Sequence, residues 1–178
     1  MTTSDRGGSQ PRPGRGAWIP AYVALGSNLD DPRLQVERAF EALERLPRSR
    51  LLLRSPCYRS RPMGPVAQPD FINAAAGLLT QLDAPTLLDE LKTLETHLGR
   101  AAPVVRWGPR RIDLDLLVHG ATRLQEPAIQ VPHPGIAERA FVLVPLCDLS
   151  PSLVVPGVGR VSGLLRRLDA SGLERIDA

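Results

Sequence analysis

Several features that define common protein classes are scarce or missing in this sequence of 178 residues. It has two cysteines, Cys57 and Cys147, far apart in the chain, so we expect free buried thiols rather than a disulfide framework. The three histidines share no spacing of the kind that binds zinc. No stretch approaches the ~18 consecutive apolar residues of a membrane helix, and the N-terminus lacks the apolar core of a signal peptide. We therefore expect a cytoplasmic protein that has no membrane partner.

Two common nucleotide-binding motifs are also absent. The glycine-rich pattern of the P-loop, which ends in Gly-Lys and then Ser or Thr, does not occur, and this excludes a P-loop enzyme. Gly157, Gly159 and Gly163 have the wrong last gap for a dinucleotide fingerprint, and too little chain follows them for a βαβ unit. Aromatic residues make up only 4% of the sequence, so each one near a cluster of polar residues carries weight.

The composition that remains is globular and mildly basic. Hydrophobic residues account for 43% and charged residues for 23% of the chain, with a formal net charge of +3. The basic residues are mostly arginine and form no dense run, so the charge favours a small anionic ligand as much as a nucleic acid. Residues 1–16 lack apolar periodicity and read as a disordered tail, which leaves 17–178 as one domain.

The periodicity of the apolar residues predicts an α+β fold. Strands are expected over 18–25, 50–58 and 71–80 and from 112 onward. One helix is expected to open at Asp30/Asp31-Pro32, with an aspartate as its N-cap, and to stop at Pro47, and another is expected over 84–98. This order, β-α-β-β-α-β, indicates a ferredoxin-like antiparallel sheet with both helices packed on one face. The other face, or the end of the sheet, is then left for a ligand and for two long loops, 59–70 and 99–111.

The remainder of the chain is expected to form short elements. Gly120 is expected to turn a hairpin into residues 122–126, and 131–135 is expected to form a turn. A short helix is predicted near 137–148 and another over 162–168.

The segment from Arg106 to Leu116 is the strongest functional signal. Its last five residues alternate apolar and acidic, which is a strand pattern that puts Asp113 and Asp115 on one face, roughly 6–7 Å apart at Cα. Two carboxylates this close repel each other unless a cation lies between them, and oxygen ligands of this kind suit Mg²⁺. Arg106, Arg110 and Arg111 add forked donors that match phosphate oxygens. The combination predicts a site for a polyphosphate.

A simpler explanation for this segment is a solvated strand face on which the arginines form surface ion pairs with the acids. Trp107, Gly108 and Pro109 lie within the arginine cluster, however, and a turn that presents a large flat ring beside phosphate donors favours a functional site.

Several motifs in a fixed order carry a resemblance to a known family. They are Tyr22-Val-Ala-Leu-Gly-Ser-Asn28, Gly64-Pro, Gln68-Pro-Asp-Phe-Ile-Asn73, Arg106-Trp-Gly-Pro-Arg110, Asp113-Leu-Asp115 and Val131-Pro-His133. Together they resemble the 6-hydroxymethyl-7,8-dihydropterin pyrophosphokinase family of folate synthesis, over about residues 18–168. The resemblance implies a ferredoxin-like fold and transfer of the terminal pyrophosphate of ATP to the hydroxymethyl oxygen of the pterin, with release of AMP.

The resemblance also implies which residues form the site. Asp113 and Asp115 would hold two Mg²⁺ ions on the phosphates of ATP, and Arg100 and Arg110 would join them in catalysis. The pterin would be sandwiched between Phe71 and Phe141 and hydrogen-bonded by Asn73. Four residues of the substrate loop would line the same pocket: Ser60, Pro62, Met63 and Gly64. The residues implicated in ATP binding are Lys92, Glu95, Arg100, Arg106, Trp107, Arg110, Leu116, Ile129, Gln130, His133 and Arg139.

Each of these residues taken alone has an ordinary explanation. Phe71 and Phe141 could be core residues, and Glu95 could be a solvated acid on a helix. Asp115 and a metal-polarised hydroxyl are both candidates for the general base, and the sequence does not choose between them.

The chain departs from the family pattern at Arg61, Phe71, Lys92, Ala102 and Pro134, which bears on ATP affinity and loop kinetics rather than on the reaction.

Two other functions are compatible with parts of the sequence. A ferredoxin-like sheet can bind RNA through exposed aromatic residues, but the aromatic motif of such sheets is missing here. A pterin or nucleotide sensor without activity is the other alternative, and the intact acid pair argues against it. We expect a monomer that binds ATP and hydroxymethyl-dihydropterin and does not bind nucleic acid.

Overall fold

The computed structural model describes residues 16–100 and 108–176. The elements in chain order are β1 (Ile19–Ser27), α1 (Pro32–Glu44), β2 (Ser49–Arg54), β3 (Cys57–Ser60), β4 (Phe71–Thr80), α2 (Ala84–His97), β5 (Asp113–His119), β6 (Leu124–Glu126), β7 (Ile129–Val131), α3 (Ala140–Leu149), β8 (Val154–Val155), β9 (Gly159–Arg160), α4 (Val161–Leu165) and β10 (Glu174–Ile176). Residues 1–15 of the predicted tail lie outside the described residues, as do Ala102, Arg106 and Trp107.

The main sheet is antiparallel throughout. Its strand order is β10-β3-β4-β1-β5, and β2 pairs with β4 beside β3. The central position of β1 between β4 and β5 is the order that a split βαβ arrangement requires. The predicted α+β class is therefore confirmed.

The predicted strand over 50–58 is instead two strands, β2 and β3, which pair in turn with β4. Ser55 and Pro56 separate them, because proline has no N–H to donate to the ladder. Ser55 fills the gap by bonding Ala75 on β4 twice: its N–H donates to the Ala75 carbonyl oxygen at 3.0 Å, and its Oγ accepts from the Ala75 N–H at 2.8 Å. These two bonds keep the chain attached to β4 between β2 and β3, so the sheet continues across the break.

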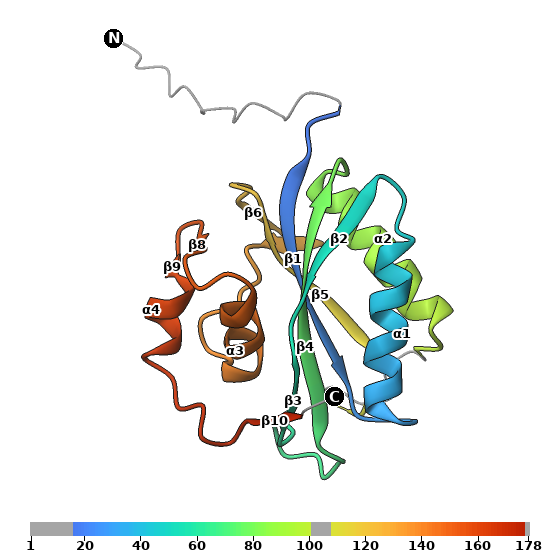
Figure 1. Cartoon of the computed structure of the whole chain (residues 1–178), viewed down its shortest axis with the longest axis vertical. Coiled ribbons are helices and arrows are strands. Elements are labelled where there is room, and N and C mark those ends of the chain that lie inside the picture. The colour runs from blue at the N-terminus through green and yellow to red at the C-terminus, as the bar shows by residue number, and fades with distance from the viewer. Residues whose placement is uncertain (1–15, 101–107, 177–178) are drawn as a thin grey trace.

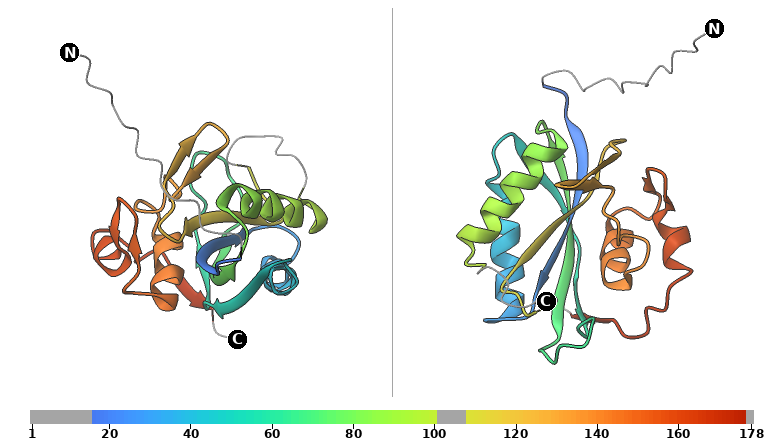
Figure 2. Two further views of the ribbon diagram at one scale, coloured as in Figure 1. Left: turned by 90° about the horizontal axis from the view of Figure 1, so that it is seen from above. Right: turned by 180° about the vertical axis from the view of Figure 1, so that it is seen from behind.

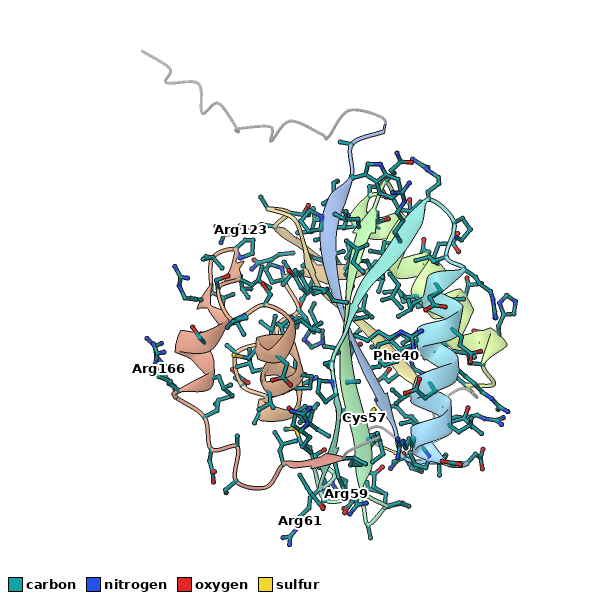
Figure 3. All side chains as sticks on the ribbon, in the orientation of Figure 1. Phe40, Cys57, Arg59, Arg61, Arg123 and Arg166 are labelled. Carbon is teal, nitrogen blue, oxygen red and sulfur yellow. The ribbon has the colours of Figure 1, made fainter. Side chains whose placement is uncertain are left out.

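The helices α1 and α2 pack on the same face of the sheet, as predicted (Figure 1). Each begins at an aspartate whose side chain accepts a backbone N–H: Asp31 accepts from Leu34, and Asp83 accepts from Thr86. The apolar side of α1, which includes Phe40, packs with the buried side chains of the sheet in the larger of two hydrophobic clusters (Figure 3). This face is a dry core.

The opposite face of the sheet is partly covered by α3 and α4, which the sequence did not assign to either face. The two sides are seen in Figure 1 and from behind in Figure 2. A second hydrophobic cluster, with Val142, Leu143 and Leu146 of α3 at its centre, packs against Leu117 and Val118 of β5. This face is therefore not left entirely to ligand and loops. What remains open lies toward the end of the sheet where β1 finishes and β4 begins.

The predicted hairpin between the strand at 112 and residues 122–126 is wrong. Gly120 does make a turn with positive φ, but β6 pairs with β7 in a separate two-stranded sheet rather than with β5. Residues 131–135 form the predicted turn, which places His133 close to the end of β5: its N–H donates to the Leu117 carbonyl oxygen at 2.9 Å. Within the described residues, no helix is both long and apolar enough to cross a membrane.

Candidate functional site

The site lies where three strands bring polar residues to the open end of the sheet. Gly26 of β1 pairs in register with Asn73 of β4 on one side and with Asp113 of β5 on the other. Neighbouring strands are about 4.8 Å apart, so Asn73 and Asp113 are separated by roughly 10 Å across the sheet. Side chains alternate along a strand, which puts Asp115 on the same face as Asp113, opposite the hydrophobic core that contains Leu114.

A cavity of about 580 Å³ occupies this end of the sheet. Its wall contains Ala24, Leu25, Gly26, Ser60, Arg61, Met63, Gln68, Phe71, Asn73, Gly108, Arg110, Asp113, Asp115, His133, Arg139, Phe141 and Val142. Five residues that the resemblance assigned to the pterin therefore share one cavity with five that it assigned to ATP and metal: Ser60, Met63, Phe71, Asn73 and Phe141 with Arg110, Asp113, Asp115, His133 and Arg139. Arg100 does not line this cavity. Pro62 and Gly64 flank Met63 in the sequence but do not line the cavity.

At one end of the cavity, aromatic rings accompany a buried amide. Asn73 is 4% exposed, and its Nδ2 donates to Ser60 Oγ at 2.9 Å and, more weakly, to the Tyr58 carbonyl oxygen at 3.4 Å. Phe71 comes from the start of β4, whereas Phe141 comes from α3, so the two rings approach from different layers of the fold. This arrangement suits a flat heterocycle with polar edges.

At the other end, two arginines converge on one carboxylate. Oδ1 of Asp113 accepts from Arg100 Nη1 at 2.7 Å, and Oδ2 of Asp113 accepts from Arg110 Nη1. Arg111, the neighbour of Arg110 in the sequence, does not line the cavity; its Nε lies 3.5 Å from Asp30 Oδ2. Residue type and spacing alone did not distinguish Arg110 from Arg111, whereas the family resemblance selected Arg110, the arginine that binds Asp113 here.

Glu95 lies behind Arg100 rather than in the cavity. It is 5% exposed, its Oε1 accepts from the Leu114 N–H at 2.6 Å, and its Oε2 accepts from Arg100 Nη1. Burial raises the pKa of Glu95 to about 7, and Asp113 adds to this, although the bond from Leu114 and the charge of Arg100 oppose it. In this structure the carboxylate supports Arg100, and its predicted contact with the nucleoside stays a prediction.

Asp115 is less compensated than its neighbour. Burial and the charge of Asp113 raise its pKa to about 6, against the lowering effect of Arg139, Arg110 and Arg100. His133 Nε2 is 4.0 Å from Asp115 Oδ2. Burial and Arg139 lower the pKa of His133 to about 4, so the imidazole is neutral at pH 7 and this contact is not an ion pair there.

A second cavity of about 210 Å³ shares Asp115 and His133 with the first. Four more residues of the predicted ATP set line it: Lys92, Leu116, Ile129 and Gln130. Arg139 lines the larger cavity instead. Asp115 and His133 therefore lie on the wall between the two cavities, whereas Asp113 lines only the larger one.

The acid pair fits a divalent cation that takes most of its ligands from elsewhere. Within residues 16–100 and 108–176, no cluster of three or more His, Cys, Asp or Glu side chains is arranged to hold a metal. A cation here would take one or two carboxylates from the protein and its other ligands from phosphate and water, which is how Mg²⁺ is usually bound. Burial, and after it the charge of Asp113, raises the pKa of Asp115, and a cation bound beside this carboxyl would favour its charged form.

Two residues of the site had no assigned role in the sequence-based predictions. Gln68 lines the larger cavity, and Asn28 bonds the segments on both sides of it. Asn28 ends the motif Tyr22–Asn28, and Gln68 begins the motif Gln68–Asn73. Membership of these family motifs was the sequence signal that could have indicated a role for both residues.

Comparisons with known proteins identify the family of this chain. The profile of a family described as 7,8-dihydro-6-hydroxymethylpterin-pyrophosphokinase matches residues 22–151. A Pseudomonas aeruginosa protein named 2-amino-4-hydroxy-6-hydroxymethyldihydropteridine pyrophosphokinase is 47% identical over 155 residues, which cover 87% of this chain and 95% of that protein. A Haemophilus influenzae protein of the same name is 40% identical over 149 residues, which cover 84% of this chain and 92% of that protein.

The fold also matches solved structures. A crystal structure of Plasmodium falciparum HPPK-DHPS A437G with pteroate superposes with a TM-score of 0.70 at 12% identity, over 93% of this chain and 48% of that one. This chain thus spans about half the length of that protein, and at such low identity the likeness concerns the fold alone. The profile match and the two bacterial relatives carry the assignment: this chain belongs to the 7,8-dihydro-6-hydroxymethylpterin-pyrophosphokinase family.

Proposed function

We propose that this chain transfers the terminal pyrophosphate of ATP to the hydroxymethyl oxygen of 6-hydroxymethyl-7,8-dihydropterin, giving the pterin diphosphate and AMP in the synthesis of folate. The observation that carries the proposal is the single cavity in which Phe71, Asn73 and Phe141 lie opposite Asp113 and Arg110. The names of the bacterial relatives support it.

The pterin occupies the aromatic end of the cavity. The flat ring stacks between Phe71 and Phe141, while Asn73 presents an amide that can both donate and accept hydrogen bonds at the ring's polar edge. Ser60 Oγ holds the Asn73 amide by accepting from Nδ2, so the amide is oriented before the ligand arrives. Met63 and Arg61 line the same cavity.

The nucleotide occupies the smaller cavity and the acid pair. Leu116, Ile129 and the stem of Lys92 provide an apolar wall for the base, and Gln130 adds a polar group. Because both cavities share Asp115 and His133, the triphosphate extends from the nucleoside toward the pterin across the acids. Arg100, Arg110 and Arg139 supply donors for its oxygens, and Arg106 and Trp107 remain predicted contacts outside the described residues.

Asp113 and Asp115 are the residues that would hold Mg²⁺, in two ions. Bound there, Mg²⁺ would neutralise the charge on the phosphates. The protein's own part is to place the hydroxymethyl oxygen in line with the β-phosphorus. As the new bond from this oxygen to the β-phosphorus forms and the hydroxyl proton is lost, the bond from the β-phosphorus to the α,β-bridging oxygen breaks, and that oxygen leaves with AMP. Positioning and charge neutralisation supply most of the acceleration in reactions of this type.

We further propose that the protein acts as a monomeric, single-domain enzyme in the cytoplasm. Cys57 and Cys147 are both free thiols, as suits a reducing compartment. The alternative role as an RNA-binding sheet needs an open sheet face that carries aromatic residues, whereas α1 and α2 pack on one face here and α3 and α4 on the other.

Identification of the nucleotide product tests the proposal. The protein is incubated with ATP, MgCl₂ and 6-hydroxymethyl-7,8-dihydropterin, and the nucleotides are separated, with a reaction that lacks the pterin as the control. AMP formed only when the pterin is present supports pyrophosphate transfer. ADP would indicate an ordinary kinase, and the absence of any new nucleotide would leave a binding protein, so either result refutes the proposal.

A further inference from the structure

One buried amide outside both cavities bonds the two segments that form the site. Asn28 directly follows β1 and is 2% exposed. Its Nδ2 donates to Gln68 Oε1 at 2.9 Å and to the Pro69 carbonyl oxygen at 3.1 Å. Its Oδ1 accepts from the Arg110 N–H at 2.7 Å, while its own N–H donates to the Arg110 carbonyl oxygen at 3.0 Å. The partners lie 40 to 82 residues away in the sequence.

The chemistry of these partners requires an amide of this length. Arg110 offers a backbone N–H, which only an oxygen can accept, and Pro69 offers a carbonyl oxygen, which only an N–H can satisfy. A carboxylate could serve Arg110 but would face the Pro69 oxygen without a proton between them. An apolar side chain would leave the Pro69 carbonyl oxygen and the Arg110 N–H without these two hydrogen bonds.

The two segments belong to opposite ends of the cavity. Pro69 lies two residues before Phe71, and Gln68 itself lines the cavity, so one segment carries the aromatic end. Arg110 binds Asp113 through its guanidinium, so the other segment carries the acid end. The neighbouring Ser27 contacts only one of the two segments: its Oγ donates to the Arg111 carbonyl oxygen at 2.6 Å. Asn28, by contrast, bonds both segments.

We propose that Asn28 is a positioning residue that couples pterin binding to ATP binding. A pterin that stacks on Phe71 fixes the segment through Pro69, and the Asn28 amide then fixes the backbone of Arg110. The ordering of Arg110 for the nucleotide is thereby partly complete before ATP binds, and by reciprocity ATP favours the pterin equally. This inference rests on the assignment of the two substrates to the two ends of the cavity made above.

A measured coupling factor tests the inference. Isothermal titration gives the Kd of 6-hydroxymethyl-7,8-dihydropterin for the protein alone and for the protein saturated with MgCl₂ and α,β-methylene-ATP. In that analogue a methylene group replaces the bridging oxygen at which transfer would break ATP, so no reaction follows. The ratio of the two Kd values is the coupling factor, and we expect it to be well above 1 for the wild-type chain.

Substitutions at Asn28 should reduce this factor. Asn28→Ala removes the side-chain bonds to both segments, and Asn28→Asp keeps the acceptor for Arg110 but loses both donors to Gln68 and Pro69. Each should lower the coupling factor by about fivefold or more, the lower end of typical coupling between sites. Gln68→Ala removes the same hydrogen bond from its acceptor end, because Gln68 Oε1 accepts from Asn28 Nδ2. Gln68 is less buried than Asn28, so this variant provides the test if Asn28→Ala does not fold.

A matched control separates coupling from stability. Gln35 of α1 is also 2% exposed, and its Nε2 donates to the Asp30 carbonyl oxygen at 2.6 Å, close to Asn28 but on neither segment. Gln35→Ala should lower the melting temperature and leave the coupling factor unchanged.

Three results would overturn the inference. They are a wild-type factor of 1, an unchanged factor in the Asn28 and Gln68 variants, and an equal loss of coupling in Gln35→Ala. If the wild-type chain bound neither ligand, the assignment of the substrates would fail, and the inference with it.

Discussion

The two ends of the cavity are built in different ways. The aromatic end takes Asn73 and Phe71 from β4 and Phe141 from α3, and its key amide is held by neutral hydrogen bonds. The acid end takes Asp113 and Asp115 from β5, but its arginines come from segments between regular elements and are held by charge. The first end is preformed for a neutral ring, whereas the second balances its own charges until a more highly charged ligand replaces them. The difference predicts that substitutions at the two ends will affect different kinetic parameters.

The largest expected effect is at the acid end. Asp113→Asn keeps the shape of the side chain but removes the charge that Arg100 and Arg110 share and that Mg²⁺ would need. Turnover should fall by at least ~10²- to 10³-fold, as when one charge-stabilising group is lost, while the pterin Kd without ATP stays within about twofold. Steady-state kinetics and pterin titration measure the two quantities. Unchanged turnover would refute the assignment of the metal site.

The complementary substitution at the aromatic end should affect binding instead. Asn73→Ala removes a buried amide and leaves Ser60 without its partner, so the pterin Kd should rise by about 5- to 150-fold, the effect of about 1–3 kcal/mol. The Kd for MgATP should not change, because Asn73 lies two strands away from Asp113. A comparable loss of MgATP affinity would show that the two ends are not separate in function.

How much of this site the sequence predicts depends on how local the signal is. The strand 71–80 is predicted at both ends, and Asp-Asp-Pro alone predicts an aspartate cap before Pro32, which the structure places at Asp31. Both predictions depend only on neighbouring residues. The alternation in Ile112–Leu116 likewise predicts that Asp113 and Asp115 share a face. The family resemblance placed the aromatic residues and the arginines in one site, which spacing alone did not do.

What the sequence could not predict depends on contacts between distant segments. The partner of β6 is β7 rather than β5, and nothing within 122–126 distinguishes the two. The face that α3 and α4 cover is decided by the sheet beneath them. The bonds of Asn28 and the orientation of Arg110 toward Asp113 and of Arg111 toward Asp30 depend on how two loops meet, and no periodicity carries that information.

A smaller effect distinguishes two roles for Glu95. If the carboxylate supports Arg100, as its position behind that guanidinium indicates, Glu95→Gln should lower kcat by about tenfold through misplacement of Arg100 and leave the KM for ATP nearly unchanged. If Glu95 instead contacts the nucleoside, the KM for ATP should rise and kcat should change little. Initial rates over a range of ATP concentrations separate the two outcomes.

The smallest expected effect concerns stability and pH at Asp115. Because its folded pKa of about 6 lies above its usual value, the folded protein holds a proton between about pH 4 and pH 6 that the unfolded chain has lost. This carboxyl therefore contributes stability below about pH 4 that is lost as the pH rises through 6. Wild type relative to Asp115→Asn should lose on the order of 1 kcal/mol across that window, a modest value because the side chain is 42% exposed. Urea unfolding of both proteins at several pH values provides the measurement, and parallel profiles would contradict it.

A crystal structure of the protein with α,β-methylene-ATP, MgCl₂ and 6-hydroxymethyl-7,8-dihydropterin tests the central claim most directly. We predict that the pterin lies between Phe71 and Phe141 with its hydroxymethyl oxygen roughly 3–3.5 Å from the β-phosphorus and in line for attack, and that the metal density lies on Asp113 and Asp115. Metal bound away from these two carboxylates, or a pterin outside the space between the two rings, would contradict the account.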